Sequence, residues 1–246
     1  MNNIKEYAKY LETWLSKTVK SAGAKGVIFG LSGGIDSAVL AGLAKKTFKN
    51  NYLAVIMHIN NSALDQKCTN QLIASLKLNY TDLKLDSTVK QLTKALNLNQ
   101  KNDADIIGNI KARIRMLSLY AFAQKHNFLV CGTSNYDEWQ TGYFTKYGDS
   151  ACDIAPLRNS LKSDVYELAQ YYKIPQIVIE RKPTASLKPK QTDEAELQLT
   201  YTNLDNFFKG LKSLSKLDLN RYKHLHHNSQ HKRQLPHAPQ PRWKLQ

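Results

Sequence analysis

The stretch Gly30-Leu31-Ser32-Gly33-Gly34-Ile35-Asp36-Ser37 follows a short apolar run, residues 27–29, and precedes an alanine- and leucine-rich segment, residues 38–48. This order predicts a strand, a glycine turn and a helix. Glycines let backbone N–H groups approach an anion closely, and the following helix directs unpaired N–H groups and a positive dipole end toward it. The stretch therefore predicts a phosphate-binding turn.

The carboxylate of Asp36 lies inside this predicted anion site, where it would repel a phosphate. The turn has neither the lysine of a Walker A loop nor the spacing of G-x-G-x-x-G. A divalent cation between the carboxylate and the phosphate would remove the repulsion, so Mg²⁺ is predicted as a cofactor. The alternative interpretation is a glycine turn that closes a strand–helix unit and binds nothing.

Residues 32–37 resemble the S-G-G-x-D-S signature of the ATP pyrophosphatase superfamily. Members of that superfamily cleave ATP between the α- and β-phosphates. The resemblance implies that ATP is a co-substrate of this chain.

Composition and charge narrow the class of protein. The 246 residues are 42% hydrophobic and 22% charged, as in soluble globular proteins, and the formal net charge is +15. This charge indicates either a polyanionic partner or a lysine-rich surface, and its spread along the chain favours the surface. The three cysteines form no C-x-x-C pair, so neither a disulfide framework nor a zinc ribbon is predicted. Without a membrane-length apolar run or a secretory signal pattern, we expect a cytoplasmic protein that binds no membrane.

Strand and helix patterns alternate along the first half of the chain. Apolar runs predict strands at residues 27–29, 52–59 and 128–131, and alternation predicts one at residues 81–85. Helical spacing predicts helices at residues 2–20, 38–48, 64–76, 87–97 and 103–126. Such alternation predicts a doubly wound parallel α/β sheet flanked by helices, whose ligands bind beyond the carboxyl ends of the strands. We expect one domain, residues 1–246, with a helical C-terminal part.

The second half is less regular. Residues 133–153 predict a long polar loop, residues 162–172 a helix, and residues 194–211 helix in pieces. The basic tail, residues 221–246, has no acidic residue and contains five of the seven histidines. Its composition is typical of a solvated end, and His224, His226 and His227 are attributed to that end rather than to a metal site.

Several further stretches resemble ammonia-dependent NAD synthetases, and they occur in that family's order over nearly the whole chain. These stretches are Asn109-Ile-Lys-Ala-Arg113-Ile-Arg115-Met116, Gly132-Thr133 followed by Glu138, Gly142-Tyr-Phe-Thr-Lys146-Tyr-Gly-Asp149, Lys182-Pro-Thr184-Ala185, Pro189-Lys-Gln-Thr-Asp-Glu194 and His231-Lys232-Arg233-Gln234.

The resemblance implies a two-step ligase reaction of NAD biosynthesis. The carboxylate of deamido-NAD attacks the α-phosphorus of ATP, and pyrophosphate leaves. Ammonia then displaces AMP from the mixed anhydride and forms the amide of NAD. Because the substrate supplies the nucleophile, the protein is expected to position the reactants and to neutralise charge.

The resemblance also assigns roles to single residues. It implies that residues 30–37, Thr133, Lys162 and Thr184 bind ATP, and that Asp36 and Glu138 are Mg²⁺ ligands. Asp149 would bind ammonium and accept its proton. The deamido-NAD contacts implied by the family pattern are Arg113, Lys146, Asp153, His231 and Lys232. The family is dimeric, so we expect a homodimer, with the helices at residues 2–20 and 103–126 as candidate interfaces.

The chain departs from the family pattern in two places. Residues 56–60, Ile56-Met-His58-Ile-Asn60, stand where the family usually has an arginine and then proline and glycine, which indicates a different adenine pocket. Ser186 stands where the family commonly has aspartate. No glutamine-hydrolysing domain is predicted within these residues.

Two rival functions remain at this level. The first is a tRNA-modifying enzyme of the same superfamily, which the loop and positive charge fit, although no RNA-binding module or catalytic cysteine pair is visible. The second is a non-catalytic nucleotide-binding module, which would not require both Asp36 and Glu138. We therefore expect no nucleic-acid partner.

Overall fold

The computed structural model describes residues 3–184 and 192–241. At its centre is a sheet of four strands in the order β3-β2-β1-β4, with every neighbouring pair parallel. The strands are β1 (Gly26–Gly30), β2 (Tyr52–His58), β3 (Tyr80–Lys84) and β4 (Phe128–Val130). The predicted α/β class with a parallel sheet is confirmed.

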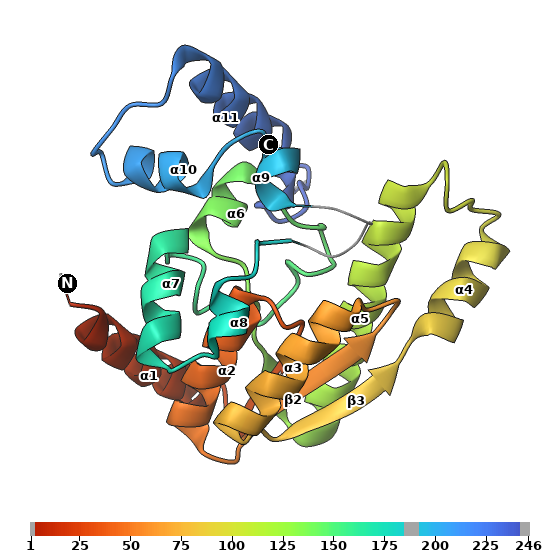
Figure 1. The fold of residues 1–246 in the computed structure, drawn as a ribbon. Coiled ribbons are helices and arrows are strands. Elements are labelled where there is room, and N and C mark those ends of the chain that lie inside the picture. Colours follow the sequence, from red (N-terminus) through yellow and green to blue (C-terminus); the bar gives the residue numbers. More distant parts are fainter. Residues whose placement is uncertain (1–2, 185–191, 242–246) are drawn as a thin grey trace.

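Helices cover both faces of the sheet (Figure 1). One face packs on α1 (Ile4–Ser21), α2 (Ile35–Phe48), α3 (Ala63–Leu76), α7 (Lys162–Tyr171) and α8 (Gln176–Ile179). The other face packs on α4 (Asp86–Ala95) and α5 (Ala104–His126). Within β1, Val27 and Phe29 enter the first core and Ile28 enters the second. Both faces of this strand are buried, which is why its sequence reads as a continuous apolar run.

Local sequence signals determine where these helices begin and end. Ser62 accepts from the backbone of Asp65, and the Asp65 carboxylate accepts from the backbone of Ser62, which forms a capping box that begins α3. Asn127 adopts a left-handed conformation with φ of 54° and ends α5, and asparagine is one of the residues that tolerates this region.

Strand β1 lies between β2 and β4. From β1 the chain continues to β2 and β3 on one side of the sheet, and then crosses to form β4 on the other side of β1. Ligands of open parallel sheets bind where the strand order reverses in this way. The turn after β1 and residues Gly132 and Thr133 after β4 both lie at this point, as the sequence predicted.

The C-terminal helices form a cap beyond the carboxyl ends of the strands (Figure 1). They are α9 (Asp193–Leu197), α10 (Tyr201–Phe208), α11 (Lys216–Asn228) and the 3₁₀ turn η1 (Gln230–Lys232). Leu197, Leu199 and Leu204 form a small core of their own, against which Tyr222 and Leu225 of α11 pack. The tail composition suggested a solvated end, but apolar residues at helical spacing dock this part of the chain.

The predicted long loop at residues 133–153 contains a helix that the sequence analysis missed. This helix is α6 (Tyr136–Thr141), which begins at a capping box between Asn135 and Glu138. Ala185, Ser186 and the start of the family stretch at Pro189, together with residues 242–246 of the basic tail, lie outside the described residues. Within residues 3–184 and 192–241, no helix combines the length and the apolar character needed to cross a bilayer.

Candidate active site

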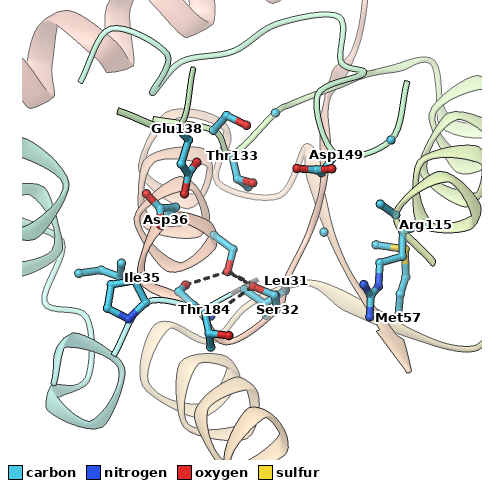
Figure 2. Close-up of a pocket in the computed structure, with 18 of the residues that line it drawn as sticks. Leu31, Ser32, Ile35, Asp36, Met57, Arg115, Thr133, Glu138, Asp149 and Thr184 are labelled. Carbon is cyan, nitrogen blue, oxygen red and sulfur yellow. Dashed lines mark hydrogen bonds between the residues drawn. The ribbon is translucent and has the colours of Figure 1, made fainter. Parts of the chain in front are cut away.

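The turn between β1 and α2 is held by its own hydroxyl groups. Ser37 Oγ donates to the carbonyl oxygen of Gly34 at 2.8 Å and lies 3.1 Å from Ser32 Oγ. Gly34 N in turn donates to Ser32 Oγ at 3.2 Å (Figure 2). The two serines therefore fix the turn in shape before any ligand binds.

Gly33 shows why the turn needs glycine. Its φ is +80°, and a Cβ at this position would lie 3.0 Å from both the carbonyl oxygen of Asp65 and the Cβ of Cys68. A side chain here would be strained in conformation and would press on α3. The glycine lets the turn pass directly against the start of α3.

Asp36, in the first turn of α2, is held by two groups from distant parts of the chain. Lys162 Nζ donates to Asp36 Oδ2 at 2.7 Å, and Asn135 Nδ2 donates to Asp36 Oδ1 at 2.9 Å. The Lys162 side chain is only 2% exposed. Burial lowers the pKa of Lys162, but the carboxylates of Asp36 and Glu138 outweigh burial, so its pKa is raised and it stays charged.

Glu138, on α6, faces Asp36 across a short gap (Figure 2). Its orientation is set by the capping box, because Asn135 N donates to Glu138 Oε2 at 3.1 Å and Glu138 N donates to Asn135 Oδ1 at 2.9 Å. Burial and the nearby charge of Asp36 raise the pKa of Glu138 well above its ordinary value. Two carboxylates that repel each other in this way offer hard oxygen ligands to a divalent cation.

These two carboxylates are few ligands for a metal ion. No group of three or more His, Cys, Asp or Glu side chains is arranged to hold a metal within residues 3–184 and 192–241. The donor set fits Mg²⁺, which commonly binds one or two carboxylates and completes its coordination with phosphate oxygens and water.

A cavity of about 250 Å³ opens in front of the turn. It collects nine of the residues predicted to bind ATP, which are Gly30, Leu31, Ser32, Gly34, Ile35, Asp36, Ser37, Thr133 and Thr184. Two other predicted residues lie just behind this wall. Gly33 packs on α3, and Lys162 is buried beneath Asp36.

Asp149 also lines the cavity. Thr145 N donates to Asp149 Oδ1 at 2.9 Å, which holds the carboxyl group at the cavity wall. Its side chain is exposed on the side of the cavity. Burial raises the pKa of Asp149, although the hydrogen bonds from Thr145 and the charge of Lys232 oppose the rise.

Four of the five predicted deamido-NAD contacts make hydrogen bonds that join the segment at residues 142–146 to α5 or to η1. Arg113 Nη2 donates to the carbonyl of Lys146 at 3.2 Å, and Lys146 Nζ donates to the carbonyl of His231 at 2.7 Å. Lys232 Nζ donates to the carbonyls of Gly142 at 2.9 Å and Phe144 at 2.8 Å. The structure thus brings these residues together, but none of them lines the 250 Å³ cavity formed by the described residues.

Asp153, the fifth predicted contact, lies elsewhere. Its carboxylate accepts from Val130 N at 2.8 Å and from the Tyr120 hydroxyl at 3.3 Å. It opens into a second hollow beside α5 and β4, lined also by Leu117, Tyr120 and Phe128. The structure therefore places Asp153 apart from the other predicted contacts.

Two residues of the site were not singled out from the sequence. Asn135 bridges Asp36 and Glu138, and its signal was the N-x-x-E capping box that begins α6. Arg115 was quoted only as part of a family stretch, and it projects from α5 into the cavity. Residues 56–60 are the stretch that departs from the family pattern. Within it, Met57 lines the cavity, whereas His58 Nε2 lies 2.7 Å from Asp82 Oδ1.

The fold and the cavity together define a nucleotide-binding α/β protein whose phosphate turn carries a carboxylate. The family model for NAD synthase matches residues 7–236. The chain is 50% identical over 244 residues to the NH(3)-dependent NAD(+) synthetase of Mycoplasma pneumoniae, and the match covers 99% of this chain and 98% of that protein.

Two solved structures are similar over nearly their whole length. NMN synthetase from Francisella tularensis has a TM-score of 0.91 at 40% identity, covering 97% of this chain and 99% of the other. NH3-dependent NAD synthetase from Campylobacter jejuni, in complex with the nitrate ion, has a TM-score of 0.80 at 30% identity, covering 98% and 100%. The chain belongs to the NAD synthase family.

Proposed function

We propose that this chain is an ammonia-dependent ligase that converts deamido-NAD into NAD at the expense of ATP, which is cleaved to AMP and pyrophosphate. The observation that carries this proposal is the meeting of Asp36, Glu138 and Asp149 at one cavity, in front of a preformed phosphate turn. The family match covers residues 7–236 and does not favour the tRNA-modifying alternative or a purely passive nucleotide-binding module.

In the first step the phosphates of ATP would lie on the turn, where backbone N–H groups and the start of α2 face them. Thr133, from the end of β4, and Thr184 reach the same cavity. Lys162 contributes by holding Asp36 in place, because its ammonium group already donates to that carboxylate at 2.7 Å.

Asp36 and Glu138 would hold Mg²⁺. This assignment is supported by the two carboxylates, which face each other at the phosphate turn. When bound, the ion would neutralise charge on the phosphates. Asn135 orients both carboxylates, since it donates to Asp36 through its side chain and to Glu138 through its backbone.

In the second step Asp149 would bind ammonium and accept a proton, because only NH₃ is nucleophilic. Its raised pKa brings its proton affinity closer to that of a base that works near neutral pH. Lys232, whose positive charge acts on Asp149, would keep part of the carboxyl population ionised.

Arg113, Lys146, His231 and Lys232 would meet the dinucleotide outside the ATP cavity. Their guanidinium, ammonium and imidazole groups suit phosphate or carboxylate recognition. Because these contacts join the C-terminal cap to the sheet domain, we treat residues 1–246 as one functional domain with its tail included.

We infer that two copies of the chain associate through the outer face of α5. Ile106 and Leu117 on this helix are 50% and 66% exposed, and the hollow that contains Asp153 lies beside the same helix. A second copy placed there would bring Asp153 into a shared substrate site. A cytoplasmic location is consistent with this chemistry, since ATP and nucleotide precursors are the substrates.

A second candidate differs in the acid that is amidated. The similarity to NMN synthetase at a TM-score of 0.91 favours a mononucleotide, nicotinic acid mononucleotide, as an alternative acceptor. Both candidates share the turn, the carboxylates and the adenylated intermediate, so the cavity does not separate them.

The test is incubation of the purified chain with ATP, Mg²⁺, ammonium and either deamido-NAD or nicotinic acid mononucleotide, with products resolved by chromatography. We expect AMP and pyrophosphate to appear only when an acid substrate is present, with deamido-NAD preferred by kcat/KM. Glu138→Gln serves as the inactive control. Release of ADP and orthophosphate, or turnover with neither acid, would contradict the proposed function.

A further inference from the structure

One face of α5 forms the cavity wall that lies opposite the phosphate turn. Ala112, Arg115, Met116 and Leu119 follow each other at helical spacing and all line the cavity. Figure 2 shows the Arg115 side chain reaching from α5 toward Met57 at the end of β2, across the cavity from Asp36 and Glu138. A guanidinium group therefore faces the phosphate turn from the far wall.

The other basic side chains of the cavity are either engaged or exposed. Arg181 donates to the carboxylate of Asp65, and Lys182 is exposed to solvent. Arg115 has no hydrogen bond or ion pair with any residue in the part of the chain that the structure describes. Burial lowers the pKa of Arg115, and the charges of Asp149, Asp65 and Asp86 oppose the effect. Arginine nevertheless stays charged in proteins, so the cavity wall holds a partly desolvated cation that no hydrogen bond or ion pair from the described residues satisfies.

A desolvated cation without a partner destabilises a fold unless a ligand uses it. The planar guanidinium group matches the oxygen atoms of a phosphate or carboxylate with two parallel hydrogen bonds. Its neighbours on α5 and β2, Met116, Leu119 and Met57, are apolar and suit the flat face of a base. A nucleotide with its terminal phosphates on the turn and its base on this apolar patch would carry its first phosphate past Arg115.

We propose that Arg115 is a further catalytic residue of this site, donating hydrogen bonds to the non-bridging oxygens of the α-phosphoryl group of ATP. This inference rests on the proposed function. As the substrate carboxylate forms a bond to the α-phosphorus, the bond to the bridging oxygen breaks and its electron pair leaves with pyrophosphate. Arg115 balances the charge that develops on the oxygens of the α-phosphoryl group, and no proton is transferred in this step. It then holds the phosphate of the adenylate until ammonia displaces AMP.

The experiment compares Arg115→Gln and Arg115→Lys with the wild type and with Lys125→Gln. Lys125 lies on the same helix, is exposed and has no role in the site, so this control removes the same charge from α5. Each protein is assayed for deamido-NAD-dependent exchange of pyrophosphate into ATP and for binding of ATP and of deamido-NAD. Thermal unfolding is followed with and without ATP, and exchange by an Arg115→Ala variant is measured with added guanidinium ion.

We expect Arg115→Gln to lower the exchange rate about 10²- to 10³-fold, as loss of one preorganised donor to a developing oxyanion does. Arg115→Lys keeps the charge but not the two parallel donors of the guanidinium group. Its exchange rate should therefore lie between those of Arg115→Gln and the wild type. The unfolding temperature without ligand should stay the same or rise, because a partly desolvated cation without a hydrogen bond is removed, while the shift produced by ATP should shrink. Guanidinium should restore part of the Arg115→Ala activity, and Lys125→Gln should behave as the wild type.

Other outcomes overturn the inference. Wild-type exchange rates in Arg115→Gln would show that the guanidinium does not act on the reaction. A fall in unfolding temperature together with activity, without rescue by guanidinium in Arg115→Ala, would assign Arg115 a structural role. Weakened binding of deamido-NAD with unchanged binding of ATP and unchanged exchange at saturation would place it on the other substrate. If the wild type itself shows no exchange, the proposed function fails rather than this inference.

Discussion

Lys162 and Lys232 were both predicted to contact a bound nucleotide, and the structure engages both, but with partners of different charge. Lys162 donates to the carboxylate of Asp36, and the nearby carboxylates raise its pKa against the effect of burial. Lys232 donates to the neutral carbonyls of Gly142 and Phe144, and burial lowers its pKa. The charge of Lys162 is neutralised by the carboxylate that it holds at the phosphate turn. The charge of Lys232 is not neutralised by its carbonyl partners, so we expect it to attract a substrate anion.

The largest expected effect follows from breaking the charged pair. Asp36→Asn keeps the shape of the side chain but removes a proposed Mg²⁺ ligand and leaves Lys162 buried without its hydrogen-bonded carboxylate. We expect adenylation to fall by about 10³-fold or more, since a metal clamp supplies several kcal/mol. The free energy of unfolding should fall by about 3–5 kcal/mol, because the buried cation loses its partner. Pyrophosphate exchange and urea unfolding measure the two effects.

The double variant Asp36→Asn with Lys162→Met separates these effects. Removing both charges should recover most of the lost stability, since neither member of the pair remains buried without the other, while adenylation stays lost. Normal activity and normal Mg²⁺ dependence in Asp36→Asn would rule out its role as a ligand. A double variant no more stable than the single one would show that the pair does not hold the turn.

Asp149→Asn tests the proposed role of the carboxylate on which the charge of Lys232 acts. The change removes the proposed proton acceptor and leaves the phosphate turn intact. We expect formation of the amide to slow by about 10²- to 10⁴-fold, as for loss of a general base. Pyrophosphate release in a single turnover should stay fast, so the adenylated intermediate accumulates. Equal slowing of both steps would contradict the assignment.

The raised pKa of Asp149 also predicts a pH dependence of stability. The folded protein holds this proton more tightly than the unfolded chain, whose aspartate has a pKa of about 3.9. The contribution of Asp149 to stability is therefore complete below about pH 4 and is lost as pH rises through the folded pKa. Unfolding free energies measured across this range should depend less on pH in Asp149→Asn than in the wild type.

Much of the fold was readable because the signals were local. The apolar run at residues 27–29 and the helical spacing along residues 103–126 each predicted an element from adjacent residues. The predicted family is confirmed by the family match over residues 7–236. The family could be predicted because the resemblance draws on many positions along the chain. Helix α6 was missed because its signal, the pair of Asn135 and Glu138, lies within a segment whose overall composition is that of a loop.

The arrangement of the site depends on contacts that sequence spacing does not reveal. Asp36 and Lys162 are 126 positions apart, and Asn135 is 99 positions from Asp36. Only the folded sheet brings them together, so resemblance assigned Lys162 to ATP without showing its carboxylate partner. The converse holds for Arg113 and Arg115, which are two positions apart in sequence. Arg115 lines the cavity, whereas Arg113 is exposed and does not line it. The residue roles predicted by resemblance stay predictions until the variants are measured.

A smaller effect is expected for Lys232, whose hydrogen-bond partners are neutral carbonyls. His231→Ala with Lys232→Ala removes a cation that retains its charge and also frees the carbonyls of Gly142 and Phe144. We expect deamido-NAD binding to weaken by about 1–3 kcal/mol, the range for lost hydrogen bonds to charged groups. ATP binding should change little, because the phosphate turn does not contact these residues. Calorimetric titration of each ligand measures the difference.

Lys216→Ala is a matched control, because Lys216 is an exposed lysine at the other end of α11. The double alanine variant is a sharper test than truncation before Arg221. Truncation also removes more than half of α11 and the hydrogen bonds from Arg221 to the carbonyls of Glu196 and Leu197. If the double variant binds deamido-NAD as tightly as the wild type, His231 and Lys232 serve only to dock the tail.

The smallest effect is expected at Lys146, whose ammonium group donates to the carbonyl of His231 at 2.7 Å and lies over the ring of Tyr147. Lys146→Gln removes a partly exposed charge and a single hydrogen bond, so deamido-NAD binding should weaken by about 0.5–1.5 kcal/mol and less at high salt. Lys146 and Lys232 both tie the η1 region to residues 142–146, so their effects on binding should not add if they act through docking of the tail. Additive losses in a double-mutant cycle would show instead that each lysine contacts the substrate independently. Titrations of the two single variants and the double variant with deamido-NAD, at two salt concentrations, distinguish these cases.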